Sequence, residues 1–489
     1  MEKKEVKSEL IIERELDELR DSFRSGKTRE ASWRRSQLKQ ILSFLQDKEQ
    51  DILHALQQDL SKHPAESFRD EIGTSIKSVN YALEGLNKWM SPNKAKMPLA
   101  AFPSTAEVVP EPLGLVLIIS SWNFPFGLSL EPLIGAIASG NVVVLKPSEL
   151  APSSSSVLAK MVGTYLDKTA IRIMEGGSSV GELLLQQKWD KIFFTGSARV
   201  GRIVMLAAVK NLTPVILELG GKCPAVVDSL PCSNKKMAVK RILSGKFGVC
   251  AGQACLAIDY ILTEKRFVST LLEEMKVLLK EQYGDNPMET KSVARIINKQ
   301  HFSRFEDLLH DPSIKDSIVH GGSFDKDGLF IEPTILIDPP LKSSIMTEEI
   351  FGPLLPIITL ERIEDSVEFI KSRSNPLAIY AFTHDKTLQN RLINETSSGS
   401  LVFNDTIVQY AIDTVPFGGV GESGFGKYHG KFSFDAFTHE KVIVRRSYLI
   451  DFWFRYPPWD YKKMQLFKAG YRYDYLNIAL IALGFKKSY

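Results

Sequence analysis

The sequence has few of the residues and patterns that mark several classes of protein. Four cysteines in 489 residues are too few for a disulfide framework. The formal net charge is +3, and basic and acidic residues are interspersed, so the composition does not predict binding to nucleic acid. The longest uncharged apolar run, residues 476–485, falls well short of the ~20 residues that cross a bilayer. The N-terminus has neither the apolar segment of a signal peptide nor the acid-poor composition of a transit peptide, so we expect a cytoplasmic protein.

What the sequence does contain is a change of pattern near residue 110. Residues 5–95 are charged and have apolar residues at steps of three and four, which predicts helices. Beyond that point short apolar runs such as GLVLIISS, NVVVLKPS and KIFFTGS alternate with helical stretches. Runs that are apolar throughout predict strands buried on both faces, and their alternation with helices predicts an α/β fold with a parallel sheet. A second strand–helix series over residues 223–425 predicts a second α/β domain.

Three of the turns that follow predicted strands carry residues suited to ligand binding, because a parallel sheet binds its ligand at the C-terminal ends of its strands. In KIFFTGSARVG, Gly196 lets the backbone approach a phosphate, and the helix after Ser197 offers free N–H groups. In VVLKPSE, Glu149 can accept hydrogen bonds from ribose hydroxyls. In SSWNFP, the Asn123 amide can donate to a developing oxyanion. Each residue taken alone is more often an ordinary turn residue, so the turns by themselves leave the function open.

The stretch FGVCAGQACLA carries two of the four cysteines, Cys250 and Cys255, and four interpretations stay open from the residues alone. A metal site lacks a nearby cluster of histidines and cysteines. A disulfide is unfavourable in a reducing compartment. A cysteine-dependent hydrolase requires a histidine that approaches only in space. The fourth interpretation is a buried inert thiol, which we adopt for Cys223, Cys232 and Cys250.

Cys255 is singled out by the motif that contains it, GQAC, which follows LELGGK at residues 217–222. Together with SWNFP, LKPSE, FTGSARVG, EEIFGP and PFGGVGESGFG, all in this order, these motifs resemble the aldehyde dehydrogenase family. The later stretch KYHGKFSFDAFTHEK resembles the family-3 branch, and plant-type members most of all. The resemblance covers residues 10 to 460 or so.

The resemblance implies a two-stage reaction on a cysteine. Cys255 would attack the aldehyde carbonyl as a thiolate. The Asn123 amide and the Cys255 backbone N–H would hold the oxyanion, at roughly 3–4 kcal/mol per donor in other enzymes. Glu218 would be the general base for the water that hydrolyses the thioester. The implied function is NAD(P)-dependent oxidation of medium- or long-chain aliphatic or aromatic aldehydes to carboxylic acids.

Two other functions stay in view at this point. One is a cysteine-dependent hydrolase or acyl transferase that uses no nicotinamide. The other is an inactive, membrane-associated scaffold. Reduction of a nicotinamide cofactor by a panel of aldehydes would distinguish all three.

The resemblance also implies a nicotinamide cofactor and the residues that bind it, and no metal. Lys146 and Glu149 match the family's adenosine-ribose contacts, and Glu349 and Phe351 match its nicotinamide-ribose contacts. The other implied cofactor residues are Trp122, Gly196, Ser197, Val200, Gly201 and Leu219. Because Glu149 should repel a 2′-phosphate, we expect NAD to be preferred and NADP to be tolerated. A second role for Glu349, as a base, stays open.

The sequence departs from the family at one place. Relatives usually have an asparagine four or five residues before the cysteine, where this chain has Ala251 and Cys250. That asparagine braces the loop, so the departure predicts a less accurately held loop and not a different nucleophile. Cys250 also gives Cys255 a redox partner, which would inactivate it.

The implied architecture has a Rossmann-type parallel-sheet cofactor domain, an α/β catalytic domain and a small β bridging element, with an aromatic-rich tail. The expected ranges, in that order, are 1–95 with 115–218, then 219–425, then 96–114 with 436–448, and finally 449–489. We expect a homodimer. The tail, which ends YLNIALIALGFKKSY, can pack on the partner subunit or lie on a membrane surface with Lys486 and Lys487 toward anionic headgroups.

Overall fold

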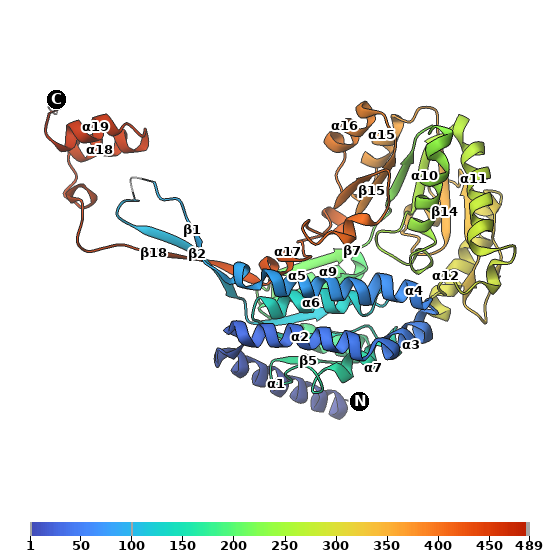
Figure 1. Cartoon of the computed structure of the whole chain (residues 1–489), viewed down its shortest axis with the longest axis horizontal. Helices are drawn as coiled ribbons and strands as arrows, with labels where there is room; N and C mark the ends of the chain where they lie inside the picture. Colours follow the sequence, from blue (N-terminus) through green and yellow to red (C-terminus); the bar gives the residue numbers. More distant parts are fainter. Residues whose placement is uncertain (1, 99–100, 486–489) are drawn as a thin grey trace. The chain divides into compact units, whose positions relative to one another are not determined.

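The structure is a computed structural model that describes residues 2–98 and 101–485, and it divides into two compact units. The larger unit comprises the chain up to Trp89 together with Pro112–His439, and the smaller unit comprises Met90–Glu111 and the chain from Glu440 onward. The larger unit contains two mainly parallel sheets, and the smaller unit contains a three-stranded sheet and two helices (Figure 1). Every residue for which the sequence predicts a catalytic or cofactor-binding role lies in the larger unit.

The first sheet of the larger unit has six strands in the order β17-β7-β6-β3-β4-β5. Numbered along the chain, its five parallel strands are arranged 3-2-1-4-5, which is the order of a dinucleotide-binding Rossmann sheet. This arrangement confirms the predicted α/β class and parallel sheet. The strands are β3 (Leu115–Ile119), β4 (Val142–Lys146), β5 (Ile171–Ile173), β6 (Lys191–Gly196), β7 (Val215–Leu219) and the antiparallel edge strand β17 (Gly424–Phe425).

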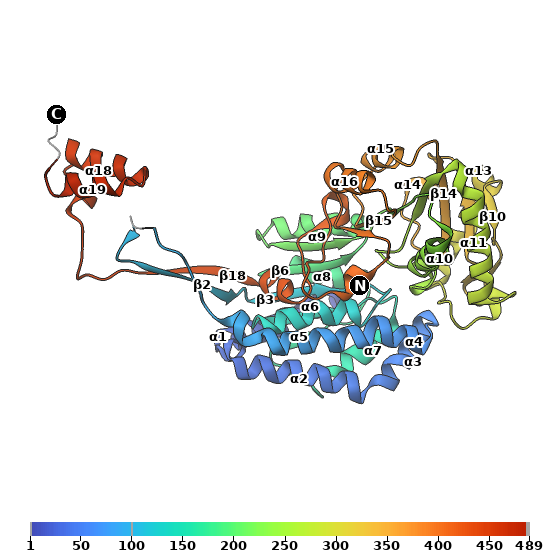
Figure 2. The same cartoon turned by 45° about the horizontal axis from the view of Figure 1, so that its top comes forward.

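Helices cover both faces of this sheet, because right-handed crossovers run outward from β3 in both directions. Figure 2 shows α7 and α9 on opposite sides of the sheet. Two N-terminal helices add a second layer, since α2 packs on α6 and α3 packs on α7. The crossover helices are α6 (Gly127–Ala138), α7 (Pro152–Met161), α8 (Ser178–Gln186) and α9 (Ala198–Val209), and the N-terminal helices are α1 (Glu2–Arg24), α2 (Ala31–Asp47), α3 (Glu49–Leu60), α4 (Pro64–Ser67) and α5 (Gly73–Met90).

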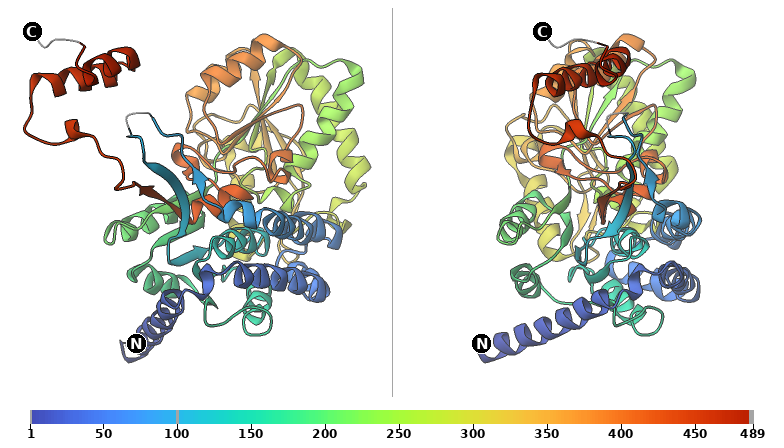
Figure 3. Two further views of the ribbon diagram at one scale, coloured as in Figure 1. Left: turned by 60° about the vertical axis from the view of Figure 1, so that its left-hand side comes forward. Right: turned by 90° about the vertical axis from the view of Figure 1, so that its left-hand side faces the viewer.

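The second sheet has seven strands in the order β10-β13-β14-β9-β8-β15-β16, all parallel except the edge strand β10. Helices α10 (Cys232–Lys246) and α11 (Lys265–Tyr283) cover one face, and α15 (Asp365–Lys371) and α16 (Lys386–Glu395) cover the other (Figure 3, left). The strands are β8 (Pro224–Val227), β9 (Tyr260–Glu264), β10 (Ile318–His320), β13 (Thr334–Ile337), β14 (Leu354–Leu360), β15 (Ala378–Phe382) and β16 (Ser400–Phe403).

The smaller unit contains the sheet β1-β2-β18 and a pair of helices. The helices pack on each other through Leu466, Ala469 and Ile481. No helix among residues 2–98 and 101–485 is long and apolar enough to cross a membrane. Lys486 and Lys487, which the sequence places toward lipid headgroups, lie outside the described residues. The elements are β1 (Asn93–Lys94), β2 (Thr105–Pro112), β18 (Thr438–Arg445), α18 (Tyr461–Tyr471) and α19 (Tyr475–Ala482).

Candidate functional site

Cys255 lies in the loop that joins α10 to β9, and neighbouring groups hold the backbone of this loop. The Cys223 thiol donates to the Cys255 carbonyl oxygen at 3.3 Å. The Tyr380 hydroxyl donates to the Leu256 carbonyl oxygen at 2.8 Å. Cys223 directly precedes β8 and Tyr380 lies in β15, so the second sheet fixes the backbone at Cys255 and at the residue that follows it.

The same loop contains two residues in the left-handed region of backbone conformation. Cys250 has φ 49° and Ala251 has φ 52°. Residues other than glycine reach this region at a cost of about 1–2 kcal/mol, and asparagine reaches it more readily than cysteine or alanine. The positions at which this chain lacks the expected asparagine are therefore positions where its backbone favours one.

Glu218 belongs to β7 and pairs through its backbone with Gly424 of β17. Its side chain is 4% exposed, and neither carboxyl oxygen has a hydrogen-bond partner among the described residues. Burial without donors raises the pKa of the Glu218 carboxyl well above its usual value. An unpartnered buried carboxyl of this kind is suited to take a proton from water, which is the role that the sequence predicts for it.

Glu218 and Cys255 line one cavity of about 300 Å³. The cavity brings together a strand residue of the first sheet and a loop residue beside the second sheet, which are 37 positions apart in the chain. Its apolar and aromatic lining residues are Phe124, Leu128, Leu219, Val249, Ala254, Leu256, Leu377, Ile407, Val408, Tyr410, Ala411, Phe417 and Tyr428. Its polar lining residues are Arg69, Asp70, Thr74, Thr195, Ser244 and Thr406. The predicted nucleophile and the predicted base therefore share one mainly apolar cavity.

The sequence predictions did not include the aromatic wall of this cavity. The rings of Tyr410 and Phe417 meet edge to face with centroids 5.3 Å apart, and Tyr428 meets Phe417 at 5.5 Å. The sequence did carry a signal for Phe417, Tyr428 and Phe124, because each lies within a stretch quoted above. Phe417 lies within PFGGVGESGFG, Tyr428 within KYHGKFSFDAFTHEK and Phe124 within SWNFP.

Asn123 lies in the turn between β3 and α6, beside the cavity residue Phe124. Its amide nitrogen donates to the Gln253 carbonyl oxygen at 3.0 Å, two residues from Cys255. An amide nitrogen has two hydrogens, so this bond orients the group and leaves the second hydrogen for an oxyanion. Gln253 is itself fixed, because its side chain donates to the carbonyl oxygens of Cys250 and Arg295, each at 3.0 Å. Gln253 is a second functional residue that the sequence did not single out.

The Cys255 thiol lies in an electrostatically unfavourable place for a thiolate. Burial raises its pKa to about 12, and the carboxyls of Glu349 and Glu218 add to the shift. The backbone N–H groups of Cys255 and Leu256 oppose it. The free protein therefore keeps its nucleophile mainly protonated at neutral pH.

Glu349 reaches toward Cys255 from the loop before β14. Its carboxyl accepts from the Gly221 N–H at 3.0 Å, and a side chain on Gly220 would occupy the space of this carboxyl. Burial raises the pKa of Glu349 to about 8, with the Asp259 carboxyl adding to it. Gly220 is thus required for the approach of Glu349.

Two aromatic residues flank this carboxyl-bearing loop. The rings of Trp122 and Phe351 meet edge to face with centroids 5.4 Å apart. Phe351 has φ 52°, which is unusual for a bulky residue. The Arg304 guanidinium donates to the carbonyl oxygens of Glu349 and Ile350 at 2.6 and 2.7 Å, which holds the loop in this conformation.

The predicted adenosine-ribose residues lie at and just beyond the end of β4. The Lys146 ammonium and the Glu149 carboxylate are 2.9 Å apart, with Lys146 buried and Glu149 partly exposed. An adjacent donor and acceptor of this kind match the two hydroxyls of a ribose.

The predicted phosphate residues lie where β6 leads into α9. Ser197 caps α9, and its hydroxyl accepts from the Val200 N–H at 3.4 Å. A side chain on Gly201 would lie 3.0 Å from Leu219, so this glycine lets α9 pack closely on the end of β7. The C-terminal ends of β4, β6 and β7 therefore present groups that fit a dinucleotide, with a helix N-terminus among them. No group of three or more His, Cys, Asp or Glu side chains in the described part of the chain could hold a metal ion.

Comparison with known proteins agrees with this geometry. A family model described as "Aldehyde dehydrogenase family" matches residues 7–443. Aldehyde dehydrogenase family 3 member F1 of Arabidopsis thaliana is 52% identical over 97% of this chain and 99% of its own length. The 4,4'-diaponeurosporen-aldehyde dehydrogenase of Staphylococcus aureus is 42% identical over 94% of this chain and 99% of its own length. A solved structure titled "Substrate bound state of Staphylococcus Aureus AldH" has a TM-score of 0.89 and 40% identity, covering 95% of this chain and 99% of that one.

Proposed function

Because the chain belongs to the aldehyde dehydrogenase family and oxidises aldehydes to carboxylic acids with NAD(P), we propose that Cys255, Asn123 and Glu218 perform the reaction. The observation that carries this proposal is that Cys255 and the buried, unpartnered carboxyl of Glu218 line one cavity. The comparisons do not favour the hydrolase or the inactive scaffold.

In the first stage Cys255 acts as the nucleophile. Its thiolate attacks the aldehyde carbonyl carbon, and the carbonyl oxygen takes up the negative charge. The free hydrogen of the Asn123 amide and the Cys255 backbone N–H donate to that oxygen. Because Gln253 already holds the amide in place, little reorganisation is needed as the charge develops.

In the second stage Glu218 activates water. When bound, NAD(P)⁺ accepts the hydride that converts the adduct on Cys255 to a thioester. Lys146, Glu149, Ser197 and Glu349 are the residues that would hold this cofactor. Glu218 then removes a proton from water, the hydroxide adds to the thioester carbonyl, and the acid leaves as Cys255 recovers its thiol.

Two substitutions test these roles. Cys255→Ala should abolish the formation of reduced nicotinamide while leaving cofactor affinity near that of the wild type. Glu218→Gln should give a burst of reduced cofactor followed by a slow steady state, because in this proposal Glu218 serves the hydrolysis of the thioester and not its formation. Cys232→Ala, at the start of α10, is the matched control and should turn over normally. A Cys255→Ala enzyme that keeps substantial activity would contradict the proposal.

We also propose the substrate class. The predominance of aromatic and aliphatic residues in the cavity supports medium- or long-chain aliphatic aldehydes and aromatic aldehydes. A chain-length series should show kcat/KM rising with the number of methylene groups until the cavity is filled. Val249→Trp, which narrows the cavity, should raise KM for the longer aldehydes only, whereas Val319→Trp on the exposed edge strand β10 should not.

For the cofactor we propose that NAD is preferred and NADP tolerated. The Glu149 carboxylate, already paired with Lys146, would accept from the ribose hydroxyls and repel a 2′-phosphate. Glu149→Gln should raise the ratio of kcat/KM for NADP to that for NAD, and Glu281→Gln on α11 should leave it unchanged. A wild-type enzyme equally efficient with NADP would show that Glu149 does not set the preference.

Two further proposals concern assembly and location. A row of exposed apolar residues on and just after α9 supports a homodimer; these residues are Ile203, Met205, Leu206, Val209 and Leu212.

The aromatic-rich C-terminal segment supports weak association with a membrane surface, because Tyr475, Leu476 and Phe485 are exposed in the smaller unit. We place the protein in the cytoplasm, with a peripheral membrane fraction if the tail binds lipid.

A further inference from the structure

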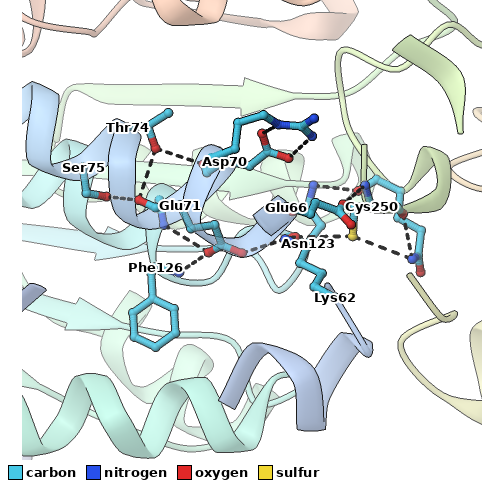
Figure 4. Close-up of polar contacts among 12 residues, drawn as sticks. Lys62, Glu66, Asp70, Glu71, Thr74, Ser75, Asn123, Phe126 and Cys250 are labelled. Carbon is cyan, nitrogen blue, oxygen red and sulfur yellow. Dashed lines mark hydrogen bonds and ion pairs between the residues drawn. The ribbon is translucent and has the colours of Figure 1, made fainter. Parts of the chain in front are cut away.

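A fully buried ion pair lies next to the turn that carries Asn123 (Figure 4). Lys62 follows α3, and Glu71 belongs to a π-helical turn, Phe68–Ile72. The Lys62 ammonium and the Glu71 carboxylate are 2.6 Å apart, and both side chains are 0% exposed. Single π-helical turns occur frequently at functional sites. Neither residue lines the cavity, so the pair does not itself meet the aldehyde.

Each member of the pair also bonds to the turn. The Lys62 ammonium donates to the Asn123 carbonyl oxygen at 2.8 Å. The Glu71 carboxylate accepts from the backbone N–H groups of Phe126 at 2.8 Å and Gly127 at 3.4 Å. The ammonium also lies 4.1 Å from the centroid of the Phe124 ring. The pair therefore holds the turn at both ends, at the oxyanion donor and at the start of α6.

The ammonium stays charged in this position. Burial lowers the pKa of Lys62, but the Glu71 carboxylate, with Cys250 and Glu66, outweighs it and raises the pKa above its usual value. A buried ion pair is seldom more stable than an apolar pair of the same volume. The stability of the protein is thus a weak explanation for these two buried charges. The directional hydrogen bonds that they make to the turn are a stronger explanation.

Residues 62–71 also contact the loop that joins α10 to β9 and carries Cys255, which we call the nucleophile loop. The Glu66 carboxylate accepts from the Cys250 N–H at 2.7 Å. The Cys250 thiol lies 3.6 Å from the Asn123 carbonyl oxygen, which Lys62 also bonds (Figure 4). Residues 62–71 therefore set the spacing between the turn of Asn123 and the loop of Cys255.

We propose that Lys62 and Glu71 are positioning residues that hold the Asn123 amide where the oxyanion forms. The inference rests on the proposed function, because it takes Asn123 to be the oxyanion donor. It adds a source of catalytic efficiency that lies outside the cavity and outside all the sequence motifs quoted above.

The test is a double-mutant cycle on the rate of reduced-cofactor formation in a single turnover. Lys62→Met with Glu71→Gln removes both charges and leaves no unpaired buried ion. It should slow this step by about 10²-fold, the loss typical of one oxyanion donor, with cofactor affinity unchanged. In an Asn123→Ala background the same double change should slow the step by less than about threefold, because the donor it positions is gone.

Lys27→Met with Asp167→Asn is the matched control. This partly buried ion pair of the same unit has a 2.7 Å separation and contacts neither the turn nor the nucleophile loop. Its removal should leave the single-turnover rate unchanged. Equal rate losses with and without Asn123 would overturn the proposal, since the pair would then act on general stability.

Hydrogen exchange followed by mass spectrometry gives a readout that needs no aldehyde. In the Lys62→Met, Glu71→Gln enzyme the peptide that contains Phe126 and Gly127 should exchange at least tenfold faster, while peptides of α11 exchange as before. Unchanged exchange in this peptide would overturn the proposal. If the wild type reduces no cofactor with any aldehyde, the proposed function fails, and the exchange result still decides whether the pair holds the turn.

Discussion

At the scale of single residues, the site combines three titratable groups in surroundings that disfavour their charged forms. Burial raises the pKa of Glu218, of Glu349 and of the Cys255 thiol, and each carboxyl adds to the shift of the thiol. A thiol that keeps its proton in the free protein is less open to unwanted reactions, because the thiolate is the reactive form. Burying these titratable groups costs stability, and such a cost is typical of functional sites.

Glu349→Gln should increase the reactivity of Cys255 in the free enzyme, and the increase should grow with pH. The pKa of Glu349 is about 8, so its charge is largely absent at pH 7 and largely present at pH 9. Where that charge is present it raises the thiol pKa, and the amide variant lacks this effect. Alkylation of Cys255 by iodoacetamide should be several-fold faster in the variant at pH 9 and nearly unchanged at pH 7.

Glu348→Gln supplies the control for this comparison, because Glu348 is the exposed neighbour of Glu349. It should alkylate like the wild type at both pH values. A wild-type rate for Glu349→Gln at pH 9 would show that the Glu349 charge does not reach the thiol.

At the scale of elements, the nucleophile loop is held in place by its surroundings more than by its own residues. Cys250 and Ala251 are left-handed, a conformation that neither residue prefers. Bonds from Glu66 and Gln253 to the backbone of Cys250 keep it there. The missing asparagine is thus replaced by one contact from a distant segment, Glu66, and one from within the loop, Gln253.

Ala251→Gly should stabilise the protein by about 1 kcal/mol, because glycine adopts this conformation without steric strain. Thermal unfolding should show a correspondingly higher Tm. Ala254→Gly, in the same loop but with φ outside the left-handed region, should instead lower Tm through the greater entropy of the unfolded chain. A lower Tm for Ala251→Gly would mean that the loop strain is relieved in some other way.

At the scale of the whole molecule, two surfaces carry apolar residues without a partner in the single chain. The first is the outer face of α9, where Leu206 is 72% and Val209 is 67% exposed. Exposed apolar residues on consecutive turns of one helix are typical of an interface between subunits.

Leu206→Asp should convert the protein to a monomer, because it would bury two carboxylates at a two-fold interface. Light scattering gives the mass directly. Val277→Asp on α11 removes an exposed apolar residue that has no such row around it and should leave the dimer intact. A dimer that survives Leu206→Asp would place the interface elsewhere.

The second surface is the pair of helices in the smaller unit. Deleting residues 474–489 removes α19 and should abolish co-sedimentation with anionic phospholipid vesicles while leaving the protein dimeric. A full-length chain that never co-sediments, together with a dissociated or unstable dimer after the deletion, would show that the segment packs on the partner subunit.

Much of the fold was predictable because it depends on local pattern. Uniform apolar runs become buried parallel strands, and the order of the motifs places Lys146, Gly196 and Leu219 at strand ends. The candidate site residues within motifs were singled out for the same reason, since strand-to-loop junctions carry both the motif and side chains suited to ligand binding. The unpartnered burial of Glu218 was not predictable, because it depends on what the other sheet and β17 place around the carboxyl.

The sequence by itself therefore determined the α/β class and the family, and it predicted the nucleophile and the base, because each is encoded in a few consecutive residues. Only the tertiary structure decided which distant groups support them. It revealed the aromatic wall of the cavity, the bond from Asn123 to Gln253 and the ion pair of Lys62 with Glu71. The physical reason is that hydrogen bonds and desolvation act over a few ångströms in space, and the residues that hydrogen bonds join at this site are up to 184 positions apart in the chain.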